Sequence, residues 1–438
     1  MASPKQPGFN SVIIVGAGPS GLLLALLLAD LDPRPDIRIL DAAETLNTAP
    51  RATHYGAPAI QLFRKAGVLP EIRRDGYMPI NVCWRKLDGT RLAGLDWTTS
   101  LDGPVTKERL HGTDHDGITV YAVGQMCALL ERELRDRAGI RVEWGSKVTA
   151  LKSGTGEKDD VATVEVEREG GSATYSADYI FGTDGGNSTV RRLLFGRNFP
   201  GFSWEEQVVA TNTEIDLDQF GWEDSNFIIH PEHWFMAARI GPHPEPKKNI
   251  WRISYGELPG LSNDELMARQ EMKFEQMLPG HPTPDQYRVV NKSPYRVHQR
   301  CCEAMRKGRI LLAADAAHLC NPFGGMGLTG GLADIGGLFQ CLEGIHSGRA
   351  DSDILDKYSD IQVKKWHDII NPISSGNIKR LFDQDPETAL ENDDFLKMLK
   401  KAETDVELRK QMLSSAYDLN HDFSQYFRKE DGGVSSRM

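Results

Sequence analysis

The chain has 438 residues, enough for two or three domains with a large core. Its net charge of −11 and the lack of a Lys/Arg-rich run argue against a nucleic-acid-binding protein. The strongest apolar run, residues 22–29, is far shorter than the ~20 residues that span a bilayer, and residues 1–10 do not look like a signal peptide. Six cysteines are too sparse for a disulfide framework, so we expect a cytoplasmic protein with no membrane partner.

The first elements along the chain predict a parallel sheet. A β-branched strand is expected over Ser11 to Val15, a helix over Gly18 to Leu31 and a second strand over Ile37 to Leu40. Strand, glycine-rich turn, helix and strand in this order form a βαβ unit. Further on we expect a helix over 57–65, a hairpin over 79–96, a helix over 124–137 and strands over 141–151, 162–167 and 178–182.

The composition then changes. Residues 207–255 alternate apolar and polar side chains and are rich in aromatic residues, which predicts an antiparallel sheet with one face forming a binding wall. A parallel-type strand is expected over 308–313, followed by a glycine-rich segment. Residues 351–427 are charged and helical in pattern, and the polar tail 428–438 is expected to be disordered.

Gly16-Ala17-Gly18-Pro19-Ser20-Gly21 is a G-x-G-x-x-G motif directly after a strand and at the start of a helix. In this setting Gly16 allows a tight turn, Gly18 lets the backbone approach a pyrophosphate and Gly21 lets helix and strand pack closely. Asp41 ends the second strand, where a carboxylate can accept the hydroxyls of an adenosine ribose and disfavours a 2′-phosphate. The pattern predicts a site for FAD or NAD, without choosing between them.

Two later segments make the choice. Residues 308–318, GRILLAADAAH, followed by Asn321-Pro322-Phe323-Gly324-Gly325-Met326-Gly327, resemble the second FAD motif of the class A flavoprotein monooxygenases, the p-hydroxybenzoate and phenol hydroxylase family. Residues 181–191, FGTDGGNSTVR, look like that family's middle motif. The resemblance covers about residues 11–341, and some features are similar to fungal secondary-metabolism members.

The resemblance implies an α/β fold of two domains: a Rossmann-type FAD-binding parallel sheet, a second, mostly antiparallel substrate-binding sheet, and C-terminal helices. We expect the FAD-binding domain to comprise residues 1–80, 115–195 and 305–350, and the substrate sheet 81–114 and 196–304. Residues 351–427 then form the helical region. The implied cofactor-binding residues are Gly16, Gly18, Gly21, Asp41, Arg51, Gln125, Asp184, Asp315, Gly327 and Leu328.

Particular roles follow from the same resemblance. Asp315 is expected at the ribityl chain of FAD, and the backbone N–H groups of Gly327 and Leu328 at the flavin ring. His318 is expected to make a structural hydrogen bond. Two positions depart from the family pattern: Ala314 replaces a glycine, which is tolerable if its backbone angles are ordinary, and Thr329 stands where the family often has asparagine.

The resemblance also implies a reaction. NADPH or NADH binds transiently and reduces FAD, and O2 then gives a flavin C4a-hydroperoxide that hydroxylates, or otherwise oxygenates, a small aromatic or enolic substrate. A base or hydrogen-bond relay is expected to deprotonate the substrate. The sequence offers His54, Tyr55, His230, His233 and Tyr255 without choosing among them. We find no metal-ligand spacing, and the oligomeric state, monomer or homodimer, stays open.

Two other classes of function remain. One is a flavin-dependent reductase or halogenase on the same fold, although the halogenase segment Trp-x-Trp-x-Ile-Pro has no match here. The other is a non-catalytic nucleotide-binding protein or a plain NAD dehydrogenase. Both nearly complete FAD motifs disfavour this last class.

Overall fold

The computed structural model describes residues 8–46, 53–96, 99–100, 103–104, 116–154, 161–241 and 249–428. Its first sheet contains the predicted βαβ unit and has the order β19-β20-β13-β1-β2-β9. All neighbours are parallel except β19 with β20. Its strands are β1 (Ser11–Val15), β2 (Asp36–Leu40), β9 (Val142–Glu143), β13 (Tyr179–Gly182), β19 (Arg306–Lys307) and β20 (Ile310–Leu312). The central strands are apolar on both faces, as expected of a parallel sheet covered on both sides.

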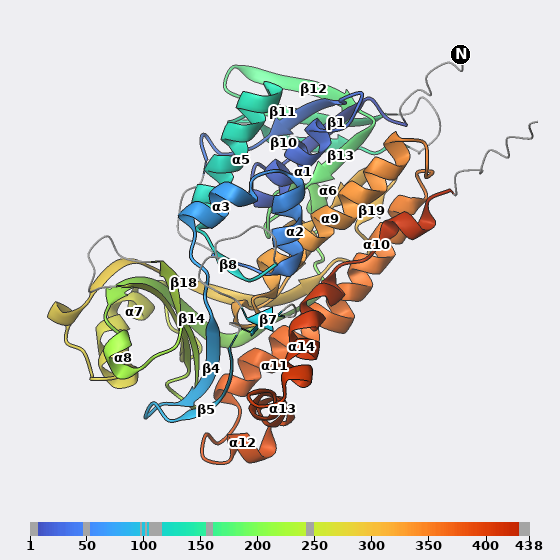
Figure 1. The fold of residues 1–438 in the computed structure, drawn as a ribbon. Coiled ribbons are helices and arrows are strands. Elements are labelled where there is room, and N and C mark those ends of the chain that lie inside the picture. The colour runs from blue at the N-terminus through green and yellow to red at the C-terminus, as the bar shows by residue number, and fades with distance from the viewer. Residues whose placement is uncertain are drawn as a thin grey trace, which may run out of the picture.

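Helices and a small sheet enclose this parallel sheet (Figure 1). Helix α1 (Pro19–Ala29) is apolar all round and buried from Ser20 to Leu28, because it packs against both α5 (Val123–Ala138) and α9 (Met326–His346). Smaller elements in this half are α2 (Ala57–Lys65), α3 (Leu69–Asp75), α6 (Thr189–Phe195) and the paired β3 (His54–Tyr55) and β8 (Thr119–Val120). A three-stranded antiparallel sheet consists of β10 (Lys147–Lys152), β11 (Ala162–Arg168) and β12 (Gly171–Ala177).

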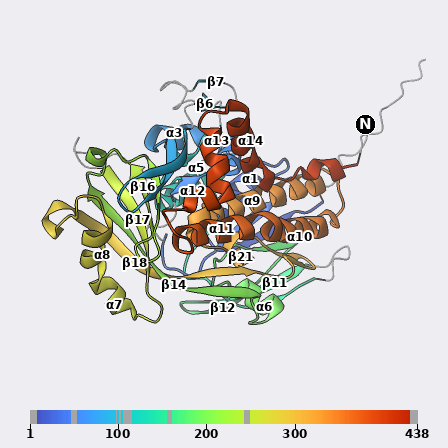
Figure 2. The same cartoon turned by 90° about the horizontal axis from the view of Figure 1, so that it is seen from below.

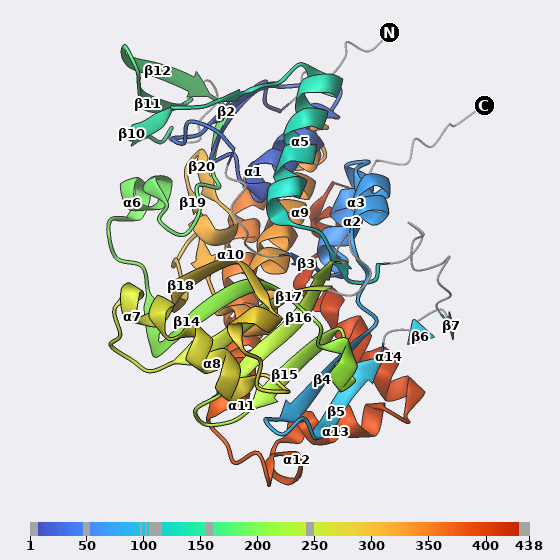
Figure 3. The same ribbon diagram turned by 90° about the vertical axis from the view of Figure 1, so that its left-hand side faces the viewer.

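The second large sheet has eight strands in the order β21-β18-β14-β17-β16-β15-β4-β5, antiparallel except for the β15–β4 pair (Figure 3). Its strands are β4 (Asn81–Lys86), β5 (Arg91–Asp96), β14 (Gly201–Ile215), β15 (Ser225–Ile229), β16 (Phe235–Gly241), β17 (Asn249–Glu257), β18 (Arg288–Cys301) and β21 (His318–Leu319). Helices α7 (Asn263–Ala268) and α8 (Gln270–Met277) lie beside it, and Phe274 of α8 packs with Phe235 and Tyr255. Short β6 (Thr99–Ser100) and β7 (Gly103–Pro104) form a separate pair.

Of the C-terminal helices, the last four cover the opposite face of the eight-stranded sheet and the first packs against α9 (Figure 2). They are α10 (Ile354–Lys365), α11 (Asn371–Phe382), α12 (Ala389–Asn392), α13 (Asp394–Ala402) and α14 (Val406–Ser414). A π-helical turn, Trp366–Ile370, separates α10 from α11. It precedes Pro372, which has no N–H to continue the α-helical pattern, so the bulge has a local cause.

Most predicted elements are present, together with helices α3, α6, α7 and α8, for which no element was expected. The strand expected over 141–151 is two strands, because Gly145 turns the chain at a φ of 63°. Strands β12 and β18 were not predicted, since their sequences are largely polar. Strand β21 lies in the segment assigned to the FAD-binding domain yet extends the other sheet. Residues 429–438 of the tail lie outside the described part, in which no helix is long and apolar enough to cross a membrane.

Candidate active site

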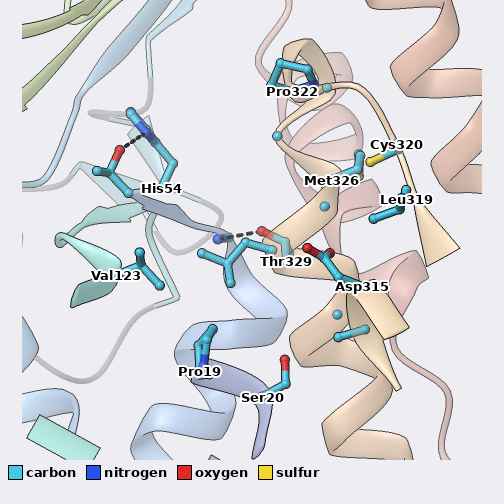
Figure 4. A pocket seen from close by; sticks show the side chains of 18 of the residues that line it. Pro19, Ser20, His54, Val123, Asp315, Leu319, Cys320, Pro322, Met326 and Thr329 are labelled. Atoms are coloured by element: carbon cyan, nitrogen blue, oxygen red, sulfur yellow. Dashed lines mark hydrogen bonds between the residues drawn. The ribbon is translucent and has the colours of Figure 1, made fainter. Parts of the chain in front are cut away.

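One cavity of about 2160 Å³ runs from the carboxyl ends of β1 and β2 to the eight-stranded sheet. Ligand pockets are usually ~300–1,000 Å³, so this one has room for more than a single small ligand. Figure 4 shows the middle of the cavity, where His54 lies across from Asp315 and Pro322. The cavity therefore joins the predicted nucleotide site to the predicted binding wall.

The glycine turn has the geometry of a dinucleotide cradle. Gly16 has a φ of 108°, and a Cβ built on Gly21 would lie 2.0 Å from the Gly16 carbonyl oxygen. A Cβ built on Gly18, in contrast, meets no atom within 4 Å. Gly18 is also the N-cap of α1 and has no side chain to occupy the free N–H groups of the first turn. The space and the donors suit a pyrophosphate.

Asp41 lines the cavity at the end of β2. Its Oδ2 accepts a hydrogen bond from the Ala17 N–H at 2.7 Å, and its Oδ1 accepts one from the Ala43 N–H at 2.8 Å. The carboxylate thus fixes the glycine turn. Because a carboxylate has about four acceptor positions, it retains capacity for ribose hydroxyls.

Asp184 and Arg191 make hydrogen bonds within the protein that stabilise the loops around the cavity. The Asp184 Oδ2 accepts hydrogen bonds from the N–H groups of Thr189 (2.7 Å) and Val190 (3.1 Å), so it caps α6. Burial raises the pKa of Asp184, although these hydrogen bonds act in the opposite direction and lower it. The Arg191 guanidinium donates to the carbonyl oxygen of Ala316 at 2.8 Å and thereby braces the segment that carries Asp315. Asp184 also lines the cavity.

Asp315 projects into the cavity from the turn after β20 (Figure 4). The preceding Ala314 has a φ of 57°, so the condition of ordinary backbone angles is not met: the position is left-handed, which favours glycine. The buried Asp334 Oδ2 accepts the Ala314 N–H and lies 2.8 Å from His318 Nε2. Despite the opposing effect of burial, Asp334 raises the pKa of His318, which makes a structural hydrogen bond as expected.

The loop from Pro322 leads into α9 beside the cavity. Gly325 caps α9 with a φ of 63° and no side chain, so the N–H groups of Gly327 and Leu328 lie in the first turn, where helical partners are lacking. Thr329 Oγ1 accepts the Gly56 N–H at 3.3 Å (Figure 4), which ties α9 to the start of α2. Of the remaining cofactor predictions, Gln125 is exposed and does not line the cavity, and Arg51 lies outside the described residues.

Of the five catalytic candidates, one lines the cavity and four do not. His54 lines the cavity, and its Nδ1 lies 3.0 Å from Thr53 Oγ1. Its buried Nε2 has no hydrogen-bond partner among the described residues. Burial and, second, the charge of Arg252 lower the pKa of His54 to about 4, so the ring is neutral at pH 7.

The other candidates lie elsewhere. Tyr55 packs in the core against Phe63, with ring centroids 5.1 Å apart. Tyr255 packs on the far face of the eight-stranded sheet against α8. His230 and His233 stack on each other, and neither lines the cavity. Burial raises the pKa of Tyr55 and of Tyr255, so both hydroxyls stay protonated at neutral pH and do not serve as bases.

Strand register explains which residues form the cavity floor. The pairings align Trp84, Phe227, Met236, Ser254, Ala210 and Ser293 in one row across six strands. A second row aligns Ser225, Ala238, Arg252, Asn212 and Asn291. All of them except Asn212 line the cavity. Alternation along each strand puts these side chains on one face, and Trp251, Ile253 and Tyr255 on the other.

Arg252 is the main functional candidate that sequence reasoning missed. Its Nε donates to Asn212 Oδ1 at 2.6 Å, and its side chain lines the cavity near His54. Burial lowers the pKa of Arg252, yet a guanidinium stays charged at neutral pH. The alternation in Trp251-Arg252-Ile253-Ser254-Tyr255 was the available signal, because it places Arg252 on the face opposite three apolar residues.

The C-terminal helices, for which no role was predicted, form the roof of the cavity. Phe395 and Met398 of α13 and Met412 of α14 line it together with Arg380 of α11. The Arg380 guanidinium binds Asp393 and lies 4.2 Å from the centre of the Phe395 ring.

The fold and the cradle define a dinucleotide-binding protein whose cofactor site opens into a substrate cavity, and comparisons with known proteins identify the family. Residues 10–367 match the family model described as "FAD binding domain", and the chain belongs to this family. It is an FAD-dependent monooxygenase, as the sequence motifs predicted.

Two characterised relatives match nearly the whole chain. Para-nitrophenol 4-monooxygenase of a Pseudomonas species is 33% identical, with 94% of this chain and 96% of the relative covered. The 6-hydroxy-3-succinoylpyridine 3-monooxygenase HspB of Pseudomonas putida is 32% identical, with 86% and 90% covered. The crystal structure of p-nitrophenol 4-monooxygenase PnpA from Pseudomonas putida superposes with a TM-score of 0.82 at 30% identity, covering 94% of this chain and 99% of that one.

Proposed function

We propose that this chain uses NADH or NADPH and O2 to hydroxylate a small phenol at the ring carbon para to the hydroxyl group. The observation that carries the proposal is one shared cavity in which the FAD cradle faces Arg252 on the floor, with His54 of β3 also lining the cavity. Phenols react with electrophilic oxygen more readily as phenolates, so a buried positive charge beside the substrate has a chemical use.

The regiochemistry is supported by the relatives' names. Each names the ring position that is oxygenated: position 4 of para-nitrophenol and position 3 of a 6-hydroxypyridine. In both compounds that position lies para to the hydroxyl and already bears a substituent. The para carbon of a phenolate is electron-rich, which fits a site that stabilises the phenolate.

FAD fits the residues present, and when bound it supplies the transfer of reducing equivalents from NAD(P)H and of oxygen from O2. Gly16, Gly18, Asp41 and Asp315, with the N–H groups of the first turn of α9, would hold it. The roles of Gln125, Arg51 and Asp184 at FAD remain predictions.

Arg252 and His54 have separate roles in this proposal. A cation within ~4–6 Å of an acidic group lowers its pKa by about 1–3 units, so Arg252 favours the bound phenolate. His54, with a pKa of about 4, accepts a hydrogen bond through a neutral ring nitrogen but cannot hold the phenol's proton. It is therefore not the final base in this proposal.

The reaction is tested with 4-nitrophenol as the probe. The FAD-loaded enzyme is expected to couple NADH or NADPH oxidation and O2 uptake to release of nitrite, the product of oxygenation at the para carbon. Formation of 4-nitrocatechol would instead show attack ortho to the hydroxyl. Coenzyme oxidation with neither product, for this or any other phenol, would refute the proposal and favour a reductase.

The role of Arg252 is tested by titrating the phenolate absorbance of 4-nitrophenol bound to the oxidised enzyme. Arg252→Met is expected to raise the pKa of the bound phenol by at least one unit, and Arg252→Lys to restore most of the difference. Arg239 lies on the next strand, where it forms ion pairs with Asp218 and Asp224, and does not line the cavity. Arg239→Met is therefore the matched control. An unchanged pKa in Arg252→Met would remove this role.

We also propose that the enzyme works in the cytoplasm, as a monomer or a homodimer. All six cysteines lie in the described residues and are free, and five are buried, which fits a reducing compartment. We keep the domain limits proposed from the sequence, with β21 as a strand of the second sheet inside the FAD-binding segment.

A further inference from the structure

A short loop, residues 320–325, leads from β21 into α9, and all of its residues line the cavity. Figure 4 shows Cys320 and Pro322 of this flavin loop on the side of the cavity that carries Asp315. The loop is followed by the first turn of α9, whose N–H groups at Gly327 and Leu328 would hold the flavin ring. The position of the flavin loop therefore decides where these donors meet the cofactor.

The flavin loop contains one tight turn. The N–H of Phe323 donates to Asn321 Oδ1 at 3.1 Å, and the N–H of Gly325 donates to the Pro322 carbonyl oxygen, also at 3.1 Å. These bonds shape the 3-10 turn Pro322–Gly324. They are local, so they do not set where the turn lies relative to the two sheets. Contacts from other elements must do that.

Gln299 of β18 holds the flavin loop on one side. It is fully buried, at 0% exposure. Its Oε1 accepts the backbone N–H of Asn321 at 3.1 Å and lies 3.4 Å from Asn321 Nδ2. A backbone N–H can only donate, so the oxygen of the Gln299 amide must face the loop and its nitrogen must face away. The strand thus fixes the residue that in turn holds the Phe323 N–H.

The nitrogen end of the same amide reaches the roof. Gln299 Nε2 donates to Ser374 Oγ of α11 at 2.7 Å. Ser374 Oγ itself donates to the carbonyl oxygen of Ile370 at 2.6 Å, so it accepts the Gln299 hydrogen through a lone pair. Ile370 ends the π-helical turn before α11. One buried amide therefore joins β18, the flavin loop and the roof helix.

The roof helix also packs directly on the flavin loop. A Cβ built on Gly324 would lie 2.9 Å from Ser374 Cα, and Asn377 Nδ2 donates to the Phe323 carbonyl oxygen at 3.4 Å. Loop and helix are so closely packed that a shift in one must move the other. Neither Gln299 nor Ser374 lines the cavity, so any effect of theirs on the reaction must pass through the loop.

We propose that Gln299 is a positioning residue for oxygen transfer: its amide fixes the flavin loop between β18 and α11 and thereby sets where the N–H groups of Gly327 and Leu328 meet the flavin ring. The inference deepens the proposed function and rests on it, because it takes the ring to lie beside the first turn of α9. Donors at that place stabilise the negative charge of the reduced flavin, and a ring held in one place keeps oxygen transfer aimed at the phenol. Without the amide, the reduced flavin is less stabilised, and more of the electron pairs from NAD(P)H reduce O2, with two protons, to H2O2 instead of oxygenating the substrate.

The test is Gln299→Met in the FAD-loaded enzyme, because methionine has a similar length but lacks both the amide oxygen and the N–H groups. We expect the ratio of the affinities for reduced and oxidised FAD to fall at least tenfold, which is a drop of about 30 mV in the two-electron reduction potential. With 4-nitrophenol, the nitrite released per NAD(P)H oxidised should fall at least threefold. The Kd of oxidised FAD should change less than threefold, because the cradle at Gly16, Gly18 and Asp41 is untouched.

Two further variants separate positioning from stability. Gln270→Met is the matched control, because Gln270 of α8 is 3% exposed and its Nε2 donates to Tyr287 Oη at 3.2 Å, but it lies away from the cavity on the other face of the sheet. It should leave the reduction potential and the nitrite yield unchanged. Ser374→Ala removes only the roof partner of Gln299 and keeps the bonds to Asn321. It is expected to lower the nitrite yield at least twofold, with a smaller change in potential, and it decides the question if Gln299→Met does not fold.

The outcomes distinguish the two proposals. If 4-nitrophenol is turned over but Gln299→Met, or Ser374→Ala in its place, behaves as the wild type, the positioning role is wrong and the proposed function stands. If the reduction potential of Gln299→Met falls but the wild type oxygenates no phenol, the positioning role stands and the proposed reaction fails. Equal changes in Gln270→Met would trace the effect to lost stability and overturn the assignment of Gln299.

Discussion

The contact between Ala314 and Gly331 gives a quantitative prediction about the FAD site. Ala314 has a φ of 57°, a conformation that costs an L-residue roughly 1–2 kcal/mol, whereas glycine adopts it freely. Ala314→Gly also raises the conformational entropy of the unfolded chain, which lowers the free energy of unfolding by about 0.5–1 kcal/mol. The net stabilisation should therefore be small, between about 0 and 1.5 kcal/mol. A methyl built on Gly331 of α9 would lie 2.7 Å from the Ala314 Cβ.

These numbers predict a coupling between the two positions. Gly331→Ala gains about 1 kcal/mol of helix propensity but overpacks, at a cost of about 1–3 kcal/mol. In the Ala314→Gly background the colliding Cβ is gone, and the nearest Ala314 atom is the Cα, at 3.2 Å from the built methyl. We expect Gly331→Ala to destabilise the wild type by about 1 kcal/mol, and a favourable interaction energy of about 1–2 kcal/mol in the double variant.

The assay is a double-mutant cycle on FAD-saturated protein, with urea unfolding and calorimetry used to check that one transition is seen. Gly330→Ala provides the control, because its methyl would meet the side chain of Ile370, also at 2.7 Å, rather than Ala314. Ala314→Gly should not rescue it. Additivity of the Ala314 and Gly331 changes within about 0.5 kcal/mol would refute the argument from this contact.

Three further predictions concern the glycine turn, His54 and Asp334. Gly18→Ala should leave the stability of the apoprotein unchanged and weaken FAD binding at least tenfold in a fluorescence titration, because its methyl extends only into the space of the cradle. Gly21→Ala should instead destabilise the apoprotein itself by about 2 kcal/mol or more, because its methyl would lie 2.0 Å from the Gly16 carbonyl oxygen. The pKa of His54 falls from 6.5 to about 4 on folding, so its contribution to the free energy of unfolding is complete above pH 6.5 and is lost as the pH falls toward 4. Lowering the pH from 7 to 5 should therefore destabilise His54→Gln by about 2 kcal/mol less than the wild type. An equal loss of stability in both proteins would contradict the burial of this ring. Asp334→Asn should lower the free energy of unfolding by about 3 kcal/mol, and by more at pH 6 than at pH 8. The reason is that the pKa of His318 is raised, so the ion pair stabilises the fold most below the ordinary histidine pKa. Equal losses of stability at both pH values would show that the pair is not ionic.

The sequence predicted the elements whose signals are local. The βαβ unit is one example: β1, the glycine turn and Asp41 lie within 31 residues, and each glycine has a backbone reason that holds in any context. The same is true of α2 and of the hairpin β4–β5, whose limits agree closely with the structure. Strand β18 was missed because its side chains are largely polar and its partner β14 lies far away in the chain.

The catalytic candidates show why local signals were insufficient for the rest. The sequence selected Tyr255 and His233 by residue type, whereas the structure places both outside the cavity. The sequence left the backbone angles of Ala314 open, because nothing in its neighbours reveals that Asp334 holds its N–H from 20 residues away.

By itself, the sequence determined the FAD cradle, the fold class and the kind of chemistry, because those depend on backbone motifs that act within short segments. Only the tertiary structure decided which face of β17 lines the cavity. Alternation places Arg252 opposite Tyr255, but a polar strand face can equally well face solvent. Helix α8 covers the face with Tyr255, while the helices from 371 to 414 roof the face with Arg252. Packing between distant segments turned an ordinary polar face into the wall of a cavity.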